Sequence, residues 1–326
     1  MIDISKFYCT CILAITALTA NQIFANENEA CLRKALADAD DTQTVGALKQ
    51  QCPDQTNENT PSRSGSSALD AHLNYEKSTW DRPYVISPHR PNYFLPLSYN
   101  NNPNNEILEG TDKTFEDIEL KFQISLKTPV IRSLFNPDIH LFVAYTNQTW
   151  WQGYNGNLSQ AIRETNHEPE IYVQFDTDWK LGPITNKILT VGFAHQSNGR
   201  YGEFSRNWNR LYAKFVFEVT DNLYFSLKPW WRESHSSKEN SDIDDYMGYG
   251  EFHTFYKIGN QNLGMMLRNN LASSGEKGTI QLDWSFPLYG HLRGYIQYFN
   301  GYGESLLDYN VSVNRLSVGF MVTDWL

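Results

Sequence analysis

Apolar and polar residues alternate along most of the chain after residue 92. Alternation with a period of two is the pattern of β-strands, because successive side chains of a strand point to opposite faces. Twelve segments carry this pattern, at residues 93–99, 115–126, 139–151, 170–179, 188–196, 208–219, 223–231, 246–258, 263–271, 278–286, 292–299 and 311–325. An even number of strands of about ten residues each is typical of an antiparallel barrel. The sequence therefore predicts an all-β fold.

The two faces of the predicted strands differ in charge. Within residues 115–126, Glu119 and Lys121 lie on one face, and Ile118 and Leu120 lie on the other. A soluble antiparallel sandwich or barrel alternates in the same way, so alternation alone leaves open which face meets lipid. The charge-free apolar face, the aromatic C-terminal end and an export signal favour a 12-stranded antiparallel transmembrane β-barrel, with its polar face inside.

The N-terminus has the features of an export signal. Lys6 precedes an uncharged apolar run that is shorter than the roughly 20 residues of a membrane-spanning helix, so residues 1–25 are predicted to be a signal peptide. Residues 53–79 begin with a polar stretch rich in serine, asparagine and proline, and we predict a flexible linker there. The barrel domain is then expected to span residues 80–326.

A small segment, residues 26–52, separates the signal peptide from the linker. It contains two helix-like pieces, and Cys31 and Cys52 are its only cysteines. An exported protein meets an oxidising compartment, where a disulfide between these two cysteines would staple the pieces into a helical hairpin. Two free thiols are the alternative.

Residues 191–215 are predicted to form a β-hairpin with polar residues near its tip. His195 and Ser197 have the parity of the apolar face on the first strand, and Asn209 has that parity on the return strand. If the hairpin is centred near Gly202, His195 lies directly opposite Asn209. Opposed residues of an antiparallel pair share a face at about 4.5–5.5 Å. The three side chains are therefore expected to converge on one outward-facing patch.

Serine, histidine and asparagine in this arrangement suit nucleophilic catalysis. A serine hydroxyl becomes a good nucleophile when an imidazole takes its proton and a third group holds the ring in the right tautomer. Asn209 can be that third group through its amide oxygen. The alternative is that residues 195–199 are a polar turn, since serine, asparagine and glycine together are common in turns.

The same region closely resembles the active site of outer membrane phospholipase A, a family of bacterial barrel lipases. The resemblance rests on HQSNGR at 195–200 and SRNWNRLY at 205–212, and it extends to RETNHEP at 163–169, YMGY at 246–249 and GYGESLLDYN at 301–310. It implies an enzyme that hydrolyses the acyl ester bonds of phospholipids and lysophospholipids, with both A1 and A2 activity.

Carried over by motif position, the resemblance assigns four catalytic roles. Ser197 would be the nucleophile, His195 the general base and then the general acid, and Asn209 the residue that orients the ring. The backbone N–H of Gly199 would stabilise the oxyanion, which is the largest contribution expected in acyl transfer.

The resemblance also implies Ca²⁺ as cofactor and an active homodimer. The Arg200 carbonyl and the Ser205 hydroxyl match calcium-binding positions, and Ser159 matches a serine that reaches the calcium ion of the partner subunit. Asn147 stands where the family has a glutamine at the dimer seam. In isolation Asn147 could equally be a turn residue at a strand end.

Location and partners follow from the outward parity. The site would meet membrane phospholipid at headgroup depth in the outer leaflet of the outer membrane. The formal charge of −10 argues against nucleic acid as a partner.

Two alternatives to an outer-membrane phospholipase remain. One is a non-catalytic outer-membrane barrel, such as a porin or adhesin with a structural HQSNG loop, and the other is a secreted soluble lipase.

Overall fold

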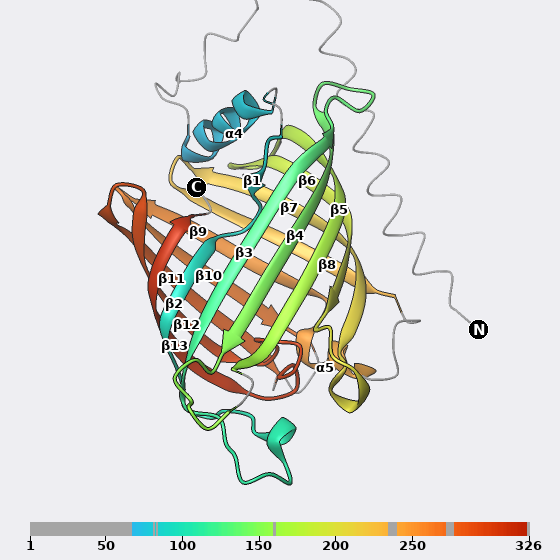
Figure 1. The fold of residues 1–326 in the computed structure, drawn as a ribbon. Helices are drawn as coiled ribbons and strands as arrows, with labels where there is room; N and C mark the ends of the chain where they lie inside the picture. The colour runs from blue at the N-terminus through green and yellow to red at the C-terminus, as the bar shows by residue number, and fades with distance from the viewer. Residues whose placement is uncertain are drawn as a thin grey trace, which may run out of the picture. The chain divides into compact units, whose positions relative to one another are not determined.

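A computed structural model of the chain describes residues 67–324, apart from 81, 83, 159–160, 234–239 and 272–276. Twelve antiparallel strands form a closed barrel (Figure 1). They are β2 (Asn92–Asn100), β3 (Ile118–Ile131), β4 (Ile139–Trp151), β5 (Ile162–Leu181), β6 (Ile184–Ser197), β7 (Asn207–Thr220), β8 (Leu223–Arg232), β9 (Gly250–Ile258), β10 (Gln261–Asn269), β11 (Gly278–Tyr289), β12 (Leu292–Gly301) and β13 (Val313–Thr323). The ring closes because β2 pairs with β13 and β3 pairs with both β2 and β4. The predicted twelve-stranded barrel is confirmed.

A two-residue strand, β1 (Ser87–Pro88), occupies the same place in the barrel as β2, because both pair with β3. β2 pairs with β3 as far as Gln123, and β1 pairs with β3 at Lys127 and Leu126. The two strands therefore share one edge of β3, and the count of barrel positions stays at twelve.

The barrel is polar inside and apolar outside. Glu119 and Lys121 are buried inside, whereas Ile118 and Ile124 on the same strand are 43% and 51% exposed on the outer face. This is the predicted parity, and it is the arrangement of a barrel whose outer wall contacts lipid. None of the helices among the described residues is long and apolar enough to cross a membrane.

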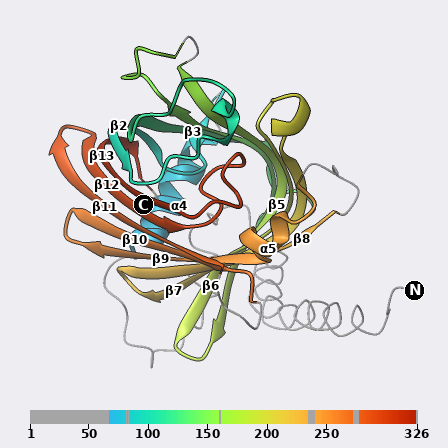
Figure 2. The same cartoon turned by 90° about the horizontal axis from the view of Figure 1, so that it is seen from below.

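The two ends of the barrel differ in their connections. At one end the strands are joined by tight turns, and helix α4 (Ala68–Thr79) and the C-terminus lie at this end (Figure 1). At the other end the connections are long, and they include the short helices η1 (Glu106–Leu108), η2 (Gly202–Phe204) and α5 (Ile243–Met247). Figure 2 views the barrel from this long-loop end.

Several predicted strand boundaries were wrong; β3, for example, runs to Ile131 rather than to residue 126, and β6 begins at Ile184 rather than at residue 188. The segment 246–258 was expected to be one strand, but α5 precedes β9, because Ile243 and Met247 bury one helical face in the barrel mouth. β5 begins at Ile162 rather than at residue 170, since its outward positions there, such as Thr165 and His167, are polar and break the apolar alternation.

The last part of the predicted linker, residues 68–79, forms helix α4. The Ser67 hydroxyl caps the helix by accepting a hydrogen bond from the Asp70 N–H, and it donates to Glu218 at 2.6 Å. Glu76 forms an ion pair with Lys127 at 2.8 Å, so the helix is tied to the barrel wall. The predicted signal peptide, the segment with Cys31 and Cys52, and the first part of the linker lie outside the described residues.

Candidate active site

His195 and Asn209 lie opposite each other on β6 and β7, in the register that the sequence predicts. The His195 Nδ1 and Asn209 Oδ1 atoms are 2.7 Å apart. The Asn209 amide nitrogen donates to the Glu233 carboxylate at 3.4 Å, which orients the amide oxygen towards the ring. Nδ1 therefore carries the proton and donates to Asn209, and Nε2 is left as an acceptor.

Ser197 follows His195 by two residues at the end of β6 and shares its outward face. It pairs with Asn207 on one side and with His167 on the other. The structure brings His195 and Asn209 into contact, and it places Ser197 beside them without a hydrogen bond to the ring. Hydrogen bonds of this kind often form only when substrate is bound.

The patch lies on the outer wall of the barrel. Its neighbours Val191, Phe193 and Leu211 are 43%, 39% and 50% exposed and point the same way as His195. Side chains of the same strands that have the opposite parity, such as Tyr212, are buried inside. The site therefore opens to the surroundings of the barrel and not to its interior.

The connection after Ser197, residues 198–206, is shaped by the buried side chain of Asn198. Its Oδ1 accepts hydrogen bonds from the backbone N–H groups of Arg200 at 3.3 Å and Arg206 at 3.0 Å, and its amide donates to the Phe204 carbonyl at 2.9 Å. Gly199 has a φ of +66°, a left-handed conformation that suits glycine. Within the described part of the chain, its N–H has no hydrogen-bond partner.

The same connection carries Arg200 and Ser205, two of the three residues that the resemblance implies as calcium ligands. The Arg200 side chain is held by Glu164 at 3.1 Å and also donates to the Arg163 carbonyl. No described residue donates a hydrogen bond to the Arg200 carbonyl, and the Ser205 hydroxyl has no described partner. Carbonyl and hydroxyl oxygens are the ligand type that Ca²⁺ prefers, so these residues fit that ion.

Carboxylate clusters in the described part of the chain do not supply an alternative metal site. Among the residues described by the structure, no group of three or more His, Cys, Asp or Glu side chains could hold a metal ion. Ser159, the third residue implied by the resemblance, lies outside the described residues.

Asn147 lies in the middle of β4 and faces outward. It pairs with Ile124 on β3 and with His167 on β5. This place within a strand rules out the strand-end turn that its sequence context also allowed.

Sequence reasoning missed His167. It lies opposite Ser197, and its Nδ1 is 2.6 Å from the Tyr145 hydroxyl and 3.3 Å from the Asn147 amide nitrogen. Extending β5 back to residue 162 would have revealed it, because the register then gives His167 the outward parity of Asn147 and Ser197.

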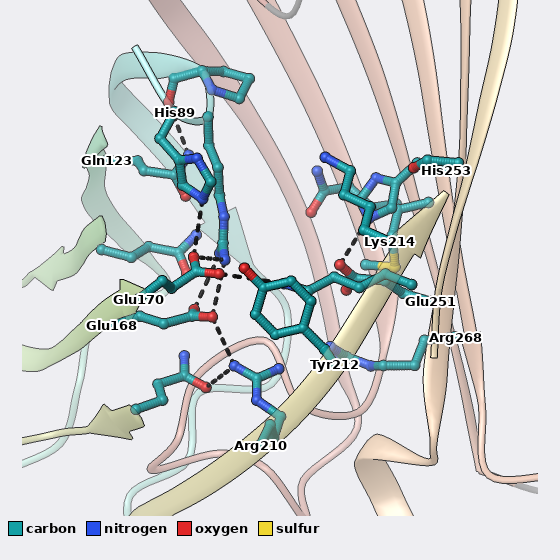
Figure 3. Close-up of a pocket in the computed structure, with 18 of the residues that line it drawn as sticks. His89, Gln123, Glu168, Glu170, Arg210, Tyr212, Lys214, Glu251, His253 and Arg268 are labelled. Carbon is teal, nitrogen blue, oxygen red and sulfur yellow. Dashed lines mark hydrogen bonds and ion pairs between the residues drawn. The ribbon is translucent and has the colours of Figure 1, made fainter. Parts of the chain in front are cut away.

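The barrel interior contains a cavity of about 240 Å³ lined mainly by charged and polar residues (Figure 3). Several of its charges are paired: Arg90 with Glu168 at 2.9 Å and with Glu170 at 2.7 Å, and Arg210 with Glu168 at 2.7 Å. The outer patch is separated from this cavity by the barrel wall. The pairs join β5 to β7, which is two strands away, and to the segment between β1 and β2, so we assign them to cross-linking the inside of the barrel.

Comparisons with known proteins identify relatives over most of the chain. A profile of the phospholipase A1 family matches residues 69–322. Phospholipase A1 of Klebsiella pneumoniae is 35% identical over 246 residues, which are 75% of this chain and 84% of that protein.

Solved structures agree with this result. A calcium-bound dimer of the Salmonella typhi outer membrane phospholipase is 35% identical, with a TM-score of 0.70 over 74% of this chain and 94% of the other. The Escherichia coli outer membrane phospholipase A, in an active-site mutant with an asparagine replaced by alanine, is 35% identical, with a TM-score of 0.71 over 76% of this chain and 95% of the other.

The family match, the level of identity and the shared barrel agree with one another. They confirm the resemblance that the HQSNGR and SRNWNRLY motifs indicate. The chain belongs to the phospholipase A1 family and is a β-barrel phospholipase.

Proposed function

We propose that this protein is a calcium-dependent outer-membrane phospholipase. It hydrolyses acyl ester bonds of phospholipids and lysophospholipids, at both the A1 and A2 positions, through Ser197, His195 and Asn209. The observation that carries the proposal is the 2.7 Å contact between His195 and Asn209 beside Ser197 on the outer wall of the barrel.

The tautomer of His195 decides which ring nitrogen can act as the general base. Because Asn209 accepts from Nδ1–H, Nε2 is free to take the proton of the Ser197 hydroxyl as its oxygen attacks the ester carbonyl. Collapse of the tetrahedral intermediate forms an acyl-serine, and His195 returns the proton to the departing alcohol of the lysolipid. Water then attacks the acyl-serine by the same route and releases the fatty acid.

The developing oxyanion needs a hydrogen-bond donor that is already in place. The Gly199 N–H is proposed to supply it. Gly199 follows Ser197 by two residues, and its N–H has no competing partner among the residues the structure describes. A preorganised backbone donor is worth far more here than in bulk water, since no reorganisation is needed during the reaction.

Calcium is proposed to bind at the Arg200 carbonyl and the Ser205 hydroxyl of one subunit, with Ser159 contributed by the other subunit. The calcium-bound dimer of the Salmonella typhi relative supports this assignment. When bound, calcium would polarise the surroundings of the oxyanion. Since two protein oxygens make a weak site, a ligand from the partner would couple calcium binding to dimerisation.

Asn147 is proposed to lie at the dimer seam. It is a polar residue facing outward from the middle of β4, where the neighbouring outward residues Val143 and Tyr145 are apolar or aromatic. A polar side chain in contact with lipid is costly. The Asn147 amide contacts His167 and Thr149 within its own subunit, and a partner amide across the seam would use its remaining donor and acceptor sites.

The site lies where β6 and β7 end at the long connections, so it is expected at headgroup depth. Long connections of outer-membrane barrels face the exterior, which puts the site at the outer leaflet. Phospholipid already in the membrane would reach it by lateral diffusion.

The test is the release of fatty acid from mixed phospholipid and detergent micelles by the purified protein, with calcium and then with a chelator. We expect Ser197→Ala to lose essentially all hydrolysis while its heat-modifiable mobility and intrinsic fluorescence stay those of the parent, because one outward hydroxyl contributes little to stability. The chelator should abolish turnover by the parent.

A serine-reactive fluorophosphonate supplies the control. It should label the parent and leave Ser197→Ala unlabelled, because only an activated serine reacts. Turnover by Ser197→Ala near the parent level, or a label on another residue, would refute the assignment. A folded parent with neither turnover nor label would favour a non-catalytic barrel.

A further inference from the structure

His167 is a second histidine on the outer wall that the proposed mechanism does not use. It faces outward from β5, directly opposite Ser197 in the β5–β6 pairing. Opposed residues of an antiparallel pair lie about 4.5–5.5 Å apart. The serine therefore lies between two imidazoles: His195, two residues earlier on its own strand, and His167 on the next strand.

The partners of His167 assign its tautomer. The Asn147 Oδ1 accepts a hydrogen bond from the Thr149 hydroxyl at 3.0 Å, so the Asn147 amide nitrogen points to the His167 ring, 3.3 Å from Nδ1. An amide nitrogen can only donate, so Nδ1 is the acceptor. The Tyr145 hydroxyl, 2.6 Å from the same atom, can donate or accept; in this tautomer it shares the single Nδ1 lone pair with the longer amide contact. The proton of the neutral ring is therefore on Nε2.

The free edge of the ring faces the oxyanion region. A Cβ atom built on Gly199 would lie 3.9 Å from both Nε2 and Cδ2 of His167. Gly199 is the residue whose N–H is proposed to stabilise the oxyanion. The Nε2–H of His167 is thus on the side of the serine where negative charge would develop.

The two imidazoles beside Ser197 are held in opposite tautomers. His195 donates from Nδ1 to Asn209 at 2.7 Å and keeps Nε2 as an acceptor, which suits a general base. His167 accepts at Nδ1 and keeps Nε2 as a donor, which does not suit a base. A neutral imidazole can act as an electrophile that polarises a carbonyl oxygen.

We propose that His167 is a further catalytic residue, whose Nε2–H donates a hydrogen bond to the oxyanion of the tetrahedral intermediate on Ser197. This inference rests on the proposed hydrolase function. The donor strengthens its hydrogen bond as the carbonyl oxygen becomes negative and keeps its proton throughout. It would act together with the Gly199 N–H.

Three substitutions at position 167 test whether His167 acts as a hydrogen-bond donor or only fills space. In His167→Gln the amide nitrogen can reach the place of Nε2, whereas in His167→Asn the shorter amide reaches only the place of Nδ1. His167→Phe keeps a ring and removes both nitrogens. We expect kcat on micellar phospholipid, at saturating calcium, to fall roughly 100-fold in the Phe and Asn variants, with KM little changed. The Gln variant should remain within about 10-fold of the parent.

His167 contacts Asn147, the residue proposed for the dimer seam, so the dimer fraction must be measured for each variant by cross-linking in the same micelles. Rates expressed per dimer should still show the loss. A kcat for His167→Phe equal to that of the parent, an equal loss in the Gln and Phe variants, or a loss that follows the dimer fraction alone would overturn the proposal.

Ser197→Ala is run in parallel to separate the two proposals. If parent turnover needs Ser197 but His167→Phe is unimpaired, the hydrolase stands and the role of His167 falls. If parent turnover does not need Ser197, the proposed function itself falls, and the role of His167 falls with it.

Discussion

Asn209 orients the ring of His195 and favours one tautomer although it is uncharged. Its amide oxygen is 2.7 Å from the ring, and its amide nitrogen is 3.4 Å from the Glu233 carboxylate. A carboxylate at position 209 would stabilise an imidazolium more strongly, but it would also face the charge of Glu233. The neutral amide lets the ring be oriented without this like-charge repulsion.

Asn209→Ala removes the only acceptor that holds Nδ1–H of His195 among the described residues. The ring can then adopt the other tautomer or rotate, and we expect kcat to fall about 100-fold with the barrel still folded. Initial rates of fatty acid release measure the effect.

The double variant Asn209→Asp with Glu233→Gln is the matched control for this prediction. It keeps an acceptor at position 209 and removes the facing charge, so most of the activity should return. Activity in the double variant as low as in Asn209→Ala would mean that Asn209 does not act through the ring.

The sequence allowed a site residue to be placed only where the pairing of its strand could be predicted. His195 and Asn209 could be placed opposite each other because both strands have clear apolar parity up to the turn. His167 could not be placed, because the outward positions in the first part of β5, such as Thr165 and His167 itself, are polar and hide the alternation. A side chain can be assigned to a face only after the register of its strand is known.

At the scale of elements, the connection 198–206 depends on one buried side chain. Asn198 makes three hydrogen bonds to backbone groups of this connection, and its side chain is 6% exposed. An asparagine side chain that hydrogen-bonds nearby backbone groups fixes the shape of a turn, because it replaces hydrogen bonds that the backbone would otherwise make. The positions of the Arg200 carbonyl and the Ser205 hydroxyl follow from that shape.

Asn198→Ala should therefore weaken calcium activation. Loss of the amide leaves backbone groups without partners, at a cost of roughly 1–3 kcal/mol in the free energy of unfolding. The calcium concentration for half-maximal turnover should rise several-fold. A calcium titration of activity at fixed protein concentration measures this shift.

Asn104→Ala is the control for Asn198→Ala. Asn104, in the connection between β2 and β3, accepts from the Glu106 N–H and donates to the Asp308 side chain in the connection after β12, and it lies outside the connection that carries the proposed calcium ligands. Its calcium titration should match that of the parent. An unchanged titration in Asn198→Ala would show that the connection keeps its shape without the amide.

Helix α5 was not predicted from the sequence, which indicated a strand from residue 246 instead. Ile243 and Met247 are spaced four residues apart, which is helical, but an aspartate-rich stretch lies between them and the strand pattern of β9 follows directly. A helix of five residues has little stability of its own. It forms because both residues are buried against the aromatic cluster of the barrel mouth.

At the scale of the whole molecule, Arg315 links the strands where the barrel closes. It lies on β13, is 1% exposed, and contacts Ser98 on β2 at 3.0 Å and Glu119 on β3 at 2.7 Å. It also pairs at 2.8 Å with Glu304, in the connection after β12. One guanidinium therefore joins the first and last strands of the barrel.

Arg315→Leu should destabilise the folded barrel by about 3–5 kcal/mol, because it leaves buried carboxylates with one cation fewer. Urea unfolding in detergent, followed by tryptophan fluorescence, measures the change. Adding Glu119→Gln to this variant should recover part of the loss, because Glu304 then still pairs with Lys121 and Asp308 still pairs with Arg163. No difference between the single and double variants would contradict an electrostatic cause.

The alternation of apolar and charged residues was enough to determine the twelve strands, the outward parity of Ser197 and the pairing of His195 with Asn209. These properties are local, because a strand's faces and a hairpin's register depend on neighbouring residues. Only the tertiary structure decided that His167 faces Ser197, that Arg315 joins β13 to β3 and that α4 docks at the short-turn end. The Arg315 contact depends on how the ring closes, and the α4 contact depends on how the helix packs against β3. The contact between His167 and Ser197 depends on a register shift between Asp176 and Trp179, which the sequence pattern does not reveal.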